Sequence, residues 1–155
     1  MIRKDRRTAG LTLLELTVAM TILSILAVGI LPLSEVSHRR AREVELRRAL
    51  RVIRDALDEY KALVDAGQIA ADPTESGYPP SLEVLVEGVA LTDAKAGHKK
   101  FLRRLPRDPM TEDGEWGRRA YADDPDSQVW GGQDVYDVYS QSDREALDGP
   151  RYSEW

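Results

Sequence analysis

Glu15 has the most unusual chemical setting in this 155-residue chain. The 18 residues that follow it, Leu16 to Leu33, carry no charge. Placing a carboxylate within such a span costs about 3 kcal/mol in hydrocarbon, and by default it marks a functional site with a partner. The alternative is that Glu15 lies near the membrane surface, where its side chain reaches into the lipid headgroups. Glu15 is therefore the first candidate for chemistry, as a charge that pairs with another group.

Cysteine and histidine, which many catalytic and metal sites use, are absent or scarce in this sequence. The chain contains no cysteine and two histidines, His38 and His98. These counts exclude disulfides, cysteine nucleophiles, and thiolate or three-histidine metal sites. Trp130-Gly131-Gly132 lacks the G-x-x-x-x-G-K-[ST] pattern of a phosphate-binding loop. The sequence predicts a protein that is not an enzyme and requires no cofactor.

Charge is distributed unevenly along the chain. The 22 Lys and Arg and 27 Asp and Glu residues give a formal net charge of −5, which argues against a general nucleic-acid-binding protein. The first ten residues nevertheless carry four basic side chains against Asp5, a net charge of 4 − 1 = +3. Residues 107–155 contain 13 acidic and 5 basic residues. The overall charge is thus the sum of a basic N-terminus and an acidic C-terminal part.

The apolar run is long enough to cross a membrane. From Leu11 to Leu33 it has 23 residues with Glu15 as its one charge, and at about 1.5 Å per residue it spans a hydrocarbon core of ~30 Å. The basic flank before it favours a cytoplasmic N-terminus, but residues 36–54 are also rich in arginine, so the positive-inside rule leaves the orientation open. A secretory signal peptide is the alternative, although its apolar region is normally about 7–15 residues long and PLSEV is a poor cleavage site.

A short motif follows the basic leader: Gly10-Leu11-Thr12-Leu13-Leu14-Glu15-Leu16. It resembles the processing motif of type IV prepilins and type II secretion pseudopilins. The resemblance implies that a prepilin peptidase cleaves between Gly10 and Leu11 and methylates the new N-terminus at Leu11. It also implies that Glu15 pairs with the positively charged N-terminus of a neighbouring subunit, and that the helix locally unwinds at Pro32 in the filament. Leu11 departs from the phenylalanine that is usual at this position.

An amphipathic helix is predicted after Pro32. Apolar residues recur at spacings of 4, 3, 4, 3 and 4, which is typical of one helix face: Leu46, Leu50, Ile53, Leu57, Tyr60 and Val64. Arginines interleaved with acidic residues fill the other faces, which predicts a solvated face or contacts with acidic patches of adjacent subunits; DNA or acidic lipid is the alternative. Gly67 is the expected C-cap.

Residues 67–155 predict a small domain of α+β class. Ser81 is expected to cap a short helix that ends at Glu87. Strands at residues 118–122 and 134–139 are expected to pair as an antiparallel hairpin packed on the long helix. The predicted parts of the chain are a cleaved leader (1–10), a transmembrane or filament-core half of the helix (11–35), an amphipathic half (36–66) and a globular domain (67–155).

The C-terminal half resembles the major pseudopilins of type II secretion systems. The segments that carry this resemblance are, in order, Gly77-Tyr78-Pro79, Leu105-Pro106-Arg107-Asp108-Pro109, Trp116-Gly117 and Tyr121. It implies a pilin-like fold, in which a long N-terminal helix packs on a small antiparallel sheet with a C-terminal loop. The lack of cysteine favours this branch over type IV pilins that close the loop with a disulfide.

Major pseudopilins tend to hold a calcium ion in the C-terminal loop. The resemblance implies candidate ligands at Asp137, Ser140, Asp143 and Asp148. Calcium takes about six to eight oxygens from carboxylates, backbone carbonyls and water. The glycine-rich D-G-x-x-G-G run of the family is absent from the C-terminal sequence SQSDREALDGPRYSEW. An acidic, solvated loop without a metal is the alternative.

The resemblance implies a structural subunit that is anchored by a single pass in the bacterial inner membrane, with its C-terminal domain in the periplasm. The subunit would assemble into a short periplasmic filament that drives protein export. The implied partners are further copies of the chain, minor pseudopilins, prepilin peptidase, the inner-membrane assembly platform, membrane lipid and, indirectly, the secretin, with no nucleic acid. Two alternatives stay open: a type IV pilus subunit for adhesion, motility or DNA uptake, and a single-pass membrane protein whose outer domain binds a ligand or senses stress.

Overall fold

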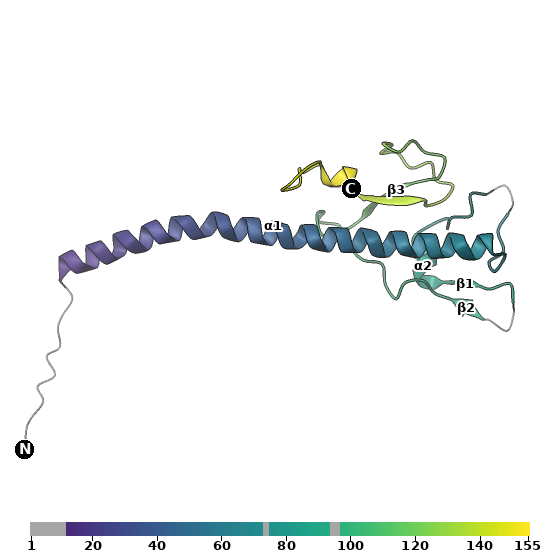
Figure 1. Ribbon diagram of the computed structural model, residues 1–155, viewed down its shortest axis with the longest axis horizontal. Helices are drawn as coiled ribbons and strands as arrows, with labels where there is room; N and C mark the ends of the chain where they lie inside the picture. Colours follow the sequence, from purple (N-terminus) through teal and green to yellow (C-terminus); the bar gives the residue numbers. More distant parts are fainter. Residues whose placement is uncertain (1–11, 73–74, 94–96) are drawn as a thin grey trace, which may run out of the picture. The chain divides into compact units, whose positions relative to one another are not determined.

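The computed structural model describes residues 12–72, 75–93 and 97–155, and for residues 28–34 it describes the backbone alone. The chain divides into two compact units, residues 1–39 and 40–155. Helix α1, Leu13–Asp65, contributes to both units. The other elements belong to the second unit (Figure 1): α2 (Glu83–Glu87), β1 (Val89–Ala90), β2 (His98–Lys99), β3 (Trp116–Arg119), β4 (Asp137–Ser140) and the 3-10 helix η1 (Tyr152–Glu154).

The predicted apolar stripe of α1 forms the centre of the core of the second unit. Leu46 and Ile53 are 0% exposed, and Val64 packs against the same cluster at its edge. The stripe shares this core with residues of α2, β3, β4 and η1: Leu85, Trp116, Val138 and Tyr152. Burying each large apolar side chain stabilises the fold by about 1.5–3 kcal/mol. The predicted α+β class, with a long N-terminal helix and small antiparallel sheets, is confirmed.

The end of α1 is set by Gly67. This glycine has a φ of +69°, a backbone conformation that disfavours residues with a Cβ atom. Its N–H donates to the carbonyl of Val64 at 2.9 Å, and the next N–H, of Gln68, donates to the carbonyl of Leu63 at 2.9 Å. This pair of hydrogen bonds is a Schellman motif, which satisfies carbonyls that the helix itself leaves unpaired. The predicted C-cap at Gly67 is confirmed.

The predicted C-terminal hairpin is also confirmed. Strands β3 and β4 pair antiparallel, with Trp116 opposite Ser140 at one end of the register. In the middle of the hairpin, Gly117 lies opposite Tyr139. A Cβ atom on Gly117 would lie 2.3 Å from Cζ of the Tyr139 ring, so the ring packs over this strand because the residue is glycine. Of the Trp-Gly pair, Trp116 is therefore buried in the core, and Gly117 provides the surface on which the Tyr139 ring packs.

The first strand of the hairpin begins and ends earlier than residues 118–122. It ends at Arg119 because the chain turns at once, with the N–H of Asp123 donating to the carbonyl of Ala120 at 3.1 Å. The Asp123 carboxylate accepts a hydrogen bond from the Ala120 N–H at 2.7 Å and so closes the same turn. Aspartate often forms turns because its carboxylate accepts a hydrogen bond from a nearby backbone N–H. The turn that Asp123 forms here ends the strand before residue 122, where the sequence predicted its end.

The second strand begins at Asp137, three residues later than predicted. Asp134 lies before the ladder, and its carboxylate accepts hydrogen bonds from the Tyr121 N–H at 2.9 Å and from the Ser76 hydroxyl. Val135 donates its N–H to the carbonyl of Pro79 at 2.8 Å. These bonds tie Asp134 and Val135 to the loop at Ser76–Pro79 and to Tyr121, and the first contact with β3 is the Tyr136 N–H, which donates to the carbonyl of Arg119 at 2.8 Å.

The predicted cap of α2 is wrong. The helix begins at Glu83 with Leu82 at the N-cap position, and no side chain caps it. The Ser81 hydroxyl hydrogen-bonds the Glu83 side chain, which, together with a backbone hydrogen bond, lowers the pKa of Glu83. The chain then forms a second, unpredicted hairpin of β1 and β2, in which Val89 pairs with Lys99. Both strands have two residues, too few for a period-two pattern to show.

Candidate functional site

The first candidate site is the N-terminal turn of α1. Thr12 precedes the helix, and its hydroxyl oxygen accepts a hydrogen bond from the Glu15 N–H at 3.2 Å. Threonine followed three residues later by glutamate is the sequence of a capping box. The helix therefore begins at Leu13, the third residue of the predicted mature chain. The predicted cleavage and methylation residues, Gly10 and Leu11, lie outside the described residues.

The hydroxyl groups beyond this turn bond to their own helix. Thr17 Oγ1 donates to the carbonyl of Leu14, Thr21 Oγ1 to that of Thr17, and Ser24 Oγ to that of Met20, at 2.8–2.9 Å. Such i−3 and i−4 bonds let hydroxyl groups enter an apolar environment with their donors satisfied. Within the described part of the chain, no group donates a hydrogen bond to the Glu15 carboxylate. Among residues 12–27, Glu15 is thus the group that needs an outside partner.

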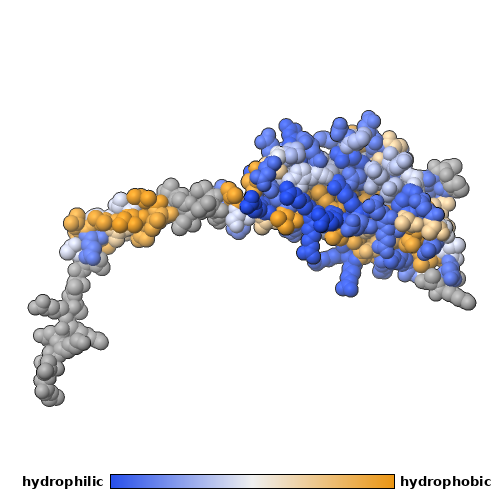
Figure 2. Space-filling model, viewed as in Figure 1, coloured by the Kyte–Doolittle hydropathy of each residue, from blue (hydrophilic) through white to orange (hydrophobic). Residues whose placement is uncertain are grey.

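Apolar side chains cover this part of α1 on every face. All residues from 12 to 27 are exposed, and Leu13 and Ile25 are 81% and 68% exposed. Figure 2 shows them as the orange stretch of the space-filling view. A helix that is apolar on all faces is normally buried in lipid or among other helices.

Within the described residues, no helix is both long enough and apolar enough to cross a membrane. The predicted transmembrane half, residues 11–35, includes Leu11, which is not described, and residues 28–34, whose side chains are not described. Pro32 is among the latter, and its backbone is helical. The predicted role of Pro32 in filament assembly stays a prediction.

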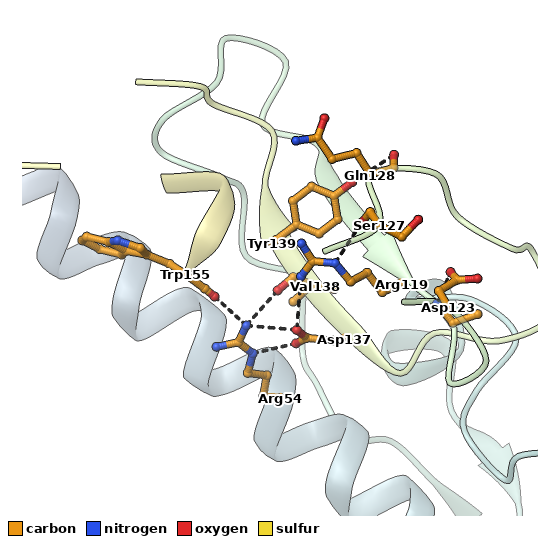
Figure 3. Close-up of polar contacts among 10 residues, drawn as sticks. Arg54, Arg119, Asp123, Ser127, Gln128, Asp137, Val138, Tyr139 and Trp155 are labelled. Carbon is orange, nitrogen blue, oxygen red and sulfur yellow. Dashed lines mark hydrogen bonds and ion pairs between the residues drawn. The ribbon is translucent and has the colours of Figure 1, made fainter. Parts of the chain in front are cut away.

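The second candidate site is the predicted calcium loop, and Asp137 is its first residue. Arg54 of α1 binds both carboxylate oxygens of Asp137, with Nε to Oδ1 at 2.7 Å and Nη2 to Oδ2 at 3.2 Å. Arg119 adds an ion pair at 3.7 Å. The same Nη2 of Arg54 donates to the main-chain oxygens of Val138 and Trp155 (Figure 3). Two guanidinium groups thus neutralise Asp137.

The other three predicted ligands do not gather around Asp137. Ser140 is 0% exposed, and its hydroxyl donates to the buried carboxylate of Asp108 at 2.6 Å. Asp143 and Asp148 are exposed. Among residues 12–72, 75–93 and 97–155, no three His, Cys, Asp or Glu side chains lie close enough together to hold a metal ion. As they lie, these residues do not fit a calcium site.

The resemblance predicts calcium binding, whereas the geometry of the described residues favours a loop without calcium, and a melting experiment distinguishes the two. We expect the same unfolding midpoint in calcium and in chelator, because an ion would have to displace both arginines from Asp137. A ligand that binds only the native state stabilises it by about 2.7 kcal/mol at 100 times its Kd. A midpoint that rises with calcium concentration would show that the loop closes around the ion.

The first candidate site is the part of the chain that known proteins share. Residues 5–31 match the family model for the prokaryotic N-terminal methylation motif. No curated protein and no solved structure matches the chain. The methylation motif includes Gly10, Leu11 and Glu15, and it ends one residue before Pro32. It is a type IV pilin-like prepilin signal and supports a place in the pilin superfamily, without singling out a pseudopilus or a pilus.

Sequence reasoning missed the polar side chains that hold the C-terminal segment on α1. Glu43 is 4% exposed, and its Oε1 accepts hydrogen bonds from the Leu147 N–H and the Tyr152 hydroxyl, both at 2.8 Å. Arg54 holds Asp137 and the Trp155 oxygen from the same helix. Both residues looked like members of a solvated charged face. A weak signal was available, since Glu43 and Arg54 stand three residues before Leu46 and three before Leu57 of the stripe, on its border.

Proposed function

We propose that this chain is a structural subunit of a type II secretion pseudopilus, cut by prepilin peptidase and polymerised from the inner membrane into the periplasm to drive protein export. The observation that carries the proposal is the methylation motif at residues 5–31. Proteins with this motif are processed subunits that polymerise, and they are structural proteins, not enzymes. The finer choice of a pseudopilus rests on the C-terminal resemblance.

The first segment of α1, residues 13–27, has the properties that polymerisation requires. Its exposed apolar residues offer a surface that copies of the chain can bury against one another after leaving lipid. Its hydroxyls are satisfied internally, so they do not oppose that burial. The one charge, on Glu15, can pair with the N-terminal ammonium group that cleavage before Leu11 creates. A charge with a single allowed partner in an apolar bundle fixes the register of the helices.

The segments that resemble major pseudopilins contact one another in the fold. The Trp116 indole N–H donates to the carbonyl of Pro106 at 2.8 Å. Asp108, 2% exposed, accepts hydrogen bonds from the Met110 N–H and the Ser140 hydroxyl. The L-P-R-D-P and W-G segments thus form one buried connection between the long loop and the β3–β4 hairpin. This mutual support favours the pseudopilin alternative over a chance resemblance of separate short segments.

Processing provides the direct test. In host cells with active prepilin peptidase, mass spectrometry of the membrane fraction should find a chain that begins at N-methylated Leu11. Gly10→Val should leave the precursor uncut, because the peptidase must accommodate the residue before the scissile bond. The matched control is Thr8→Val, two residues upstream, which should be cut normally. A chain that retains Met1 in such cells would exclude both pilin alternatives and favour the single-pass sensor.

Secretion assays then separate the two kinds of filament. Deleting the chain should block export of the folded substrates of the secretion system and leave the cell surface unchanged. Long surface fibres that disappear with the chain, together with normal export, would instead identify a type IV pilus subunit.

A further inference from the structure

A basic groove of about 880 Å³ runs along α1 in the second unit. One wall is the helix and the other is the segment from Leu102 to Arg107. Its floor is apolar, with Val44 60% exposed and Val52 38% exposed. Four arginines and one glutamate line it, a net charge of 4 − 1 = +3: Arg48, Arg103, Arg104, Arg107 and Glu45.

The groove presents both exposed apolar side chains and positive charge. Arg103 and Arg104 are exposed, and within the described residues no acidic side chain forms an ion pair with either of them. Because exposed valines and arginines line the same groove, a complementary partner would be apolar where it meets the valines and acidic where it meets the arginines. Such complementarity of charge gives an interface its specificity and its speed of association.

The acidic loop at residues 121–129 has this composition. Asp124 and Asp126 are exposed, and within the described residues neither forms an ion pair. Val129, at the end of the loop, is 78% exposed, more than any other large apolar residue whose side chain the structure describes beyond residue 27. No residue of this loop lines the groove, so the contact has to come from another molecule.

The loop has a fixed shape before it meets a partner. The Ser127 N–H donates to the carbonyl of Asp124 at 2.9 Å, and its hydroxyl donates to the carbonyl of Val129 at 2.8 Å. From the hairpin, Arg119 Nε and the Tyr139 hydroxyl donate to the carbonyls of Ser127 and Gln128 (Figure 3). A loop held in this way loses little conformational entropy on binding.

We propose that the acidic loop of one copy of this chain docks in the basic groove of the next copy. The inference rests on the proposed filament function and names a contact within that filament. Val129 packs on Val44 and Val52, while Asp124 and Asp126 pair with arginines of the groove. The groove and the loop are different surfaces of the described chain, so the contact is head-to-tail, and such a contact builds a filament when its rotation does not close a ring.

Cross-linking in the full-length chain tests the contact. Because the sequence has no cysteine, cysteines placed at Val52→Cys and Val129→Cys are the only reactive thiols. In cells that assemble the filament, a short flexible bismaleimide should convert the double variant into a ladder of multimers. Each single variant should give no ladder, since a thiol in the groove then meets no thiol in the loop. A double variant that stays monomeric in visible filaments would overturn the proposed contact and leave the filament function standing.

Charge reversal tests the chemistry of the same contact. On the cross-linking background, Arg103→Glu with Arg104→Glu should reduce the ladder at least about tenfold, and so should Asp124→Arg with Asp126→Arg. Combining the four reversals should restore at least half of it. The matched control is Arg40→Glu with Arg51→Glu, exposed arginines of α1 outside the groove, which should leave the ladder unchanged. Unchanged melting midpoints in all variants will show that the domain is folded.

Two results would overturn the proposed charge pairing. If the groove reversals leave the ladder intact but abolish flotation of the chain with phosphatidylglycerol vesicles, the groove arginines bind an anionic lipid surface and do not pair with the loop carboxylates. If neither set of reversals changes the ladder, the contact does not depend on these charges. A chain that keeps Met1 and forms no filament would contradict the proposed filament function itself. That result is distinct from a filament without the groove–loop contact.

Discussion

Cells that carry Glu15→Leu should form far fewer filaments, although the peptidase should still cut the chain. The substitution removes the one charge from a helix segment that is otherwise apolar on every face. Without it, helices can pack in several registers of equal energy, and the ammonium group of the neighbouring N-terminus enters the bundle unpaired. An unpaired charge in such surroundings costs about 3 kcal/mol for every subunit added. Filament yield in sheared fractions should fall at least about tenfold.

Two further variants separate the charge of Glu15 from its place in the helix cap. Glu15→Gln keeps a side chain of the same length but cannot pair with an ammonium ion, so it should assemble as poorly as the leucine variant. Ser24→Ala, the matched control, removes a hydroxyl that bonds only to its own helix and should assemble normally. Normal filaments from Glu15→Leu would remove the pairing role. In that case the glutamate would serve the capping box with Thr12, and Thr12→Ala would become the damaging variant.

Arg54→Met should lower the free energy of unfolding of the second unit by about 2 kcal/mol, a fall of roughly 5–10 °C in melting midpoint. The substitution keeps the length and apolar stem of the side chain and removes four hydrogen bonds, to Asp137, Val138 and Trp155. Among the described residues, the Asp137 carboxylate then keeps the ion pair of 3.7 Å with Arg119 and no other. The side chains are 40% and 24% exposed, so water replaces part of the loss.

The neighbouring Arg51→Met is the matched control for this prediction. Arg51 is exposed on the same helix, and substitutions of such surface residues usually change stability by less than about 0.5 kcal/mol. A double-mutant cycle of Arg54→Met with Asp137→Asn should give a coupling energy of about 1 kcal/mol or more. Equal melting midpoints for the Arg51 and Arg54 variants would mean that the contacts of Arg54 add nothing to the stability of the fold.

The parts of the fold that follow from local chemistry were predictable from the sequence. Spacing alone placed Leu46 and Ile53 in the core, and Gly67 marked the helix end because a left-handed residue was required there. The hairpin followed from two segments with strand composition. Its exact ends did not, since side chains such as that of Asp123 compete with the strand by forming turns.

The polar contacts between distant segments were not predictable. Arg54 and Asp137 are 83 positions apart, and Glu43 and Tyr152 are 109 apart, so no local pattern pairs them. The calcium prediction named Asp137 as a candidate ligand, and no local pattern indicated that Arg54 of α1 binds its carboxylate. At the N-terminus the motif could be recognised from the sequence because it is contiguous, and residues 5–31 match the methylation-motif family model.

The location of the core bears on the order of events during biogenesis. Every described residue of the hydrophobic cluster lies between Leu46 and Trp155, so the second unit can complete its fold without residues 12–39. The peptidase would then act on a precursor whose outer domain is already native. Withdrawal of the apolar segment from the bilayer would likewise require no unfolding of that domain. For the proposed filament subunit, folding of this domain and packing of the apolar segment are therefore separate steps.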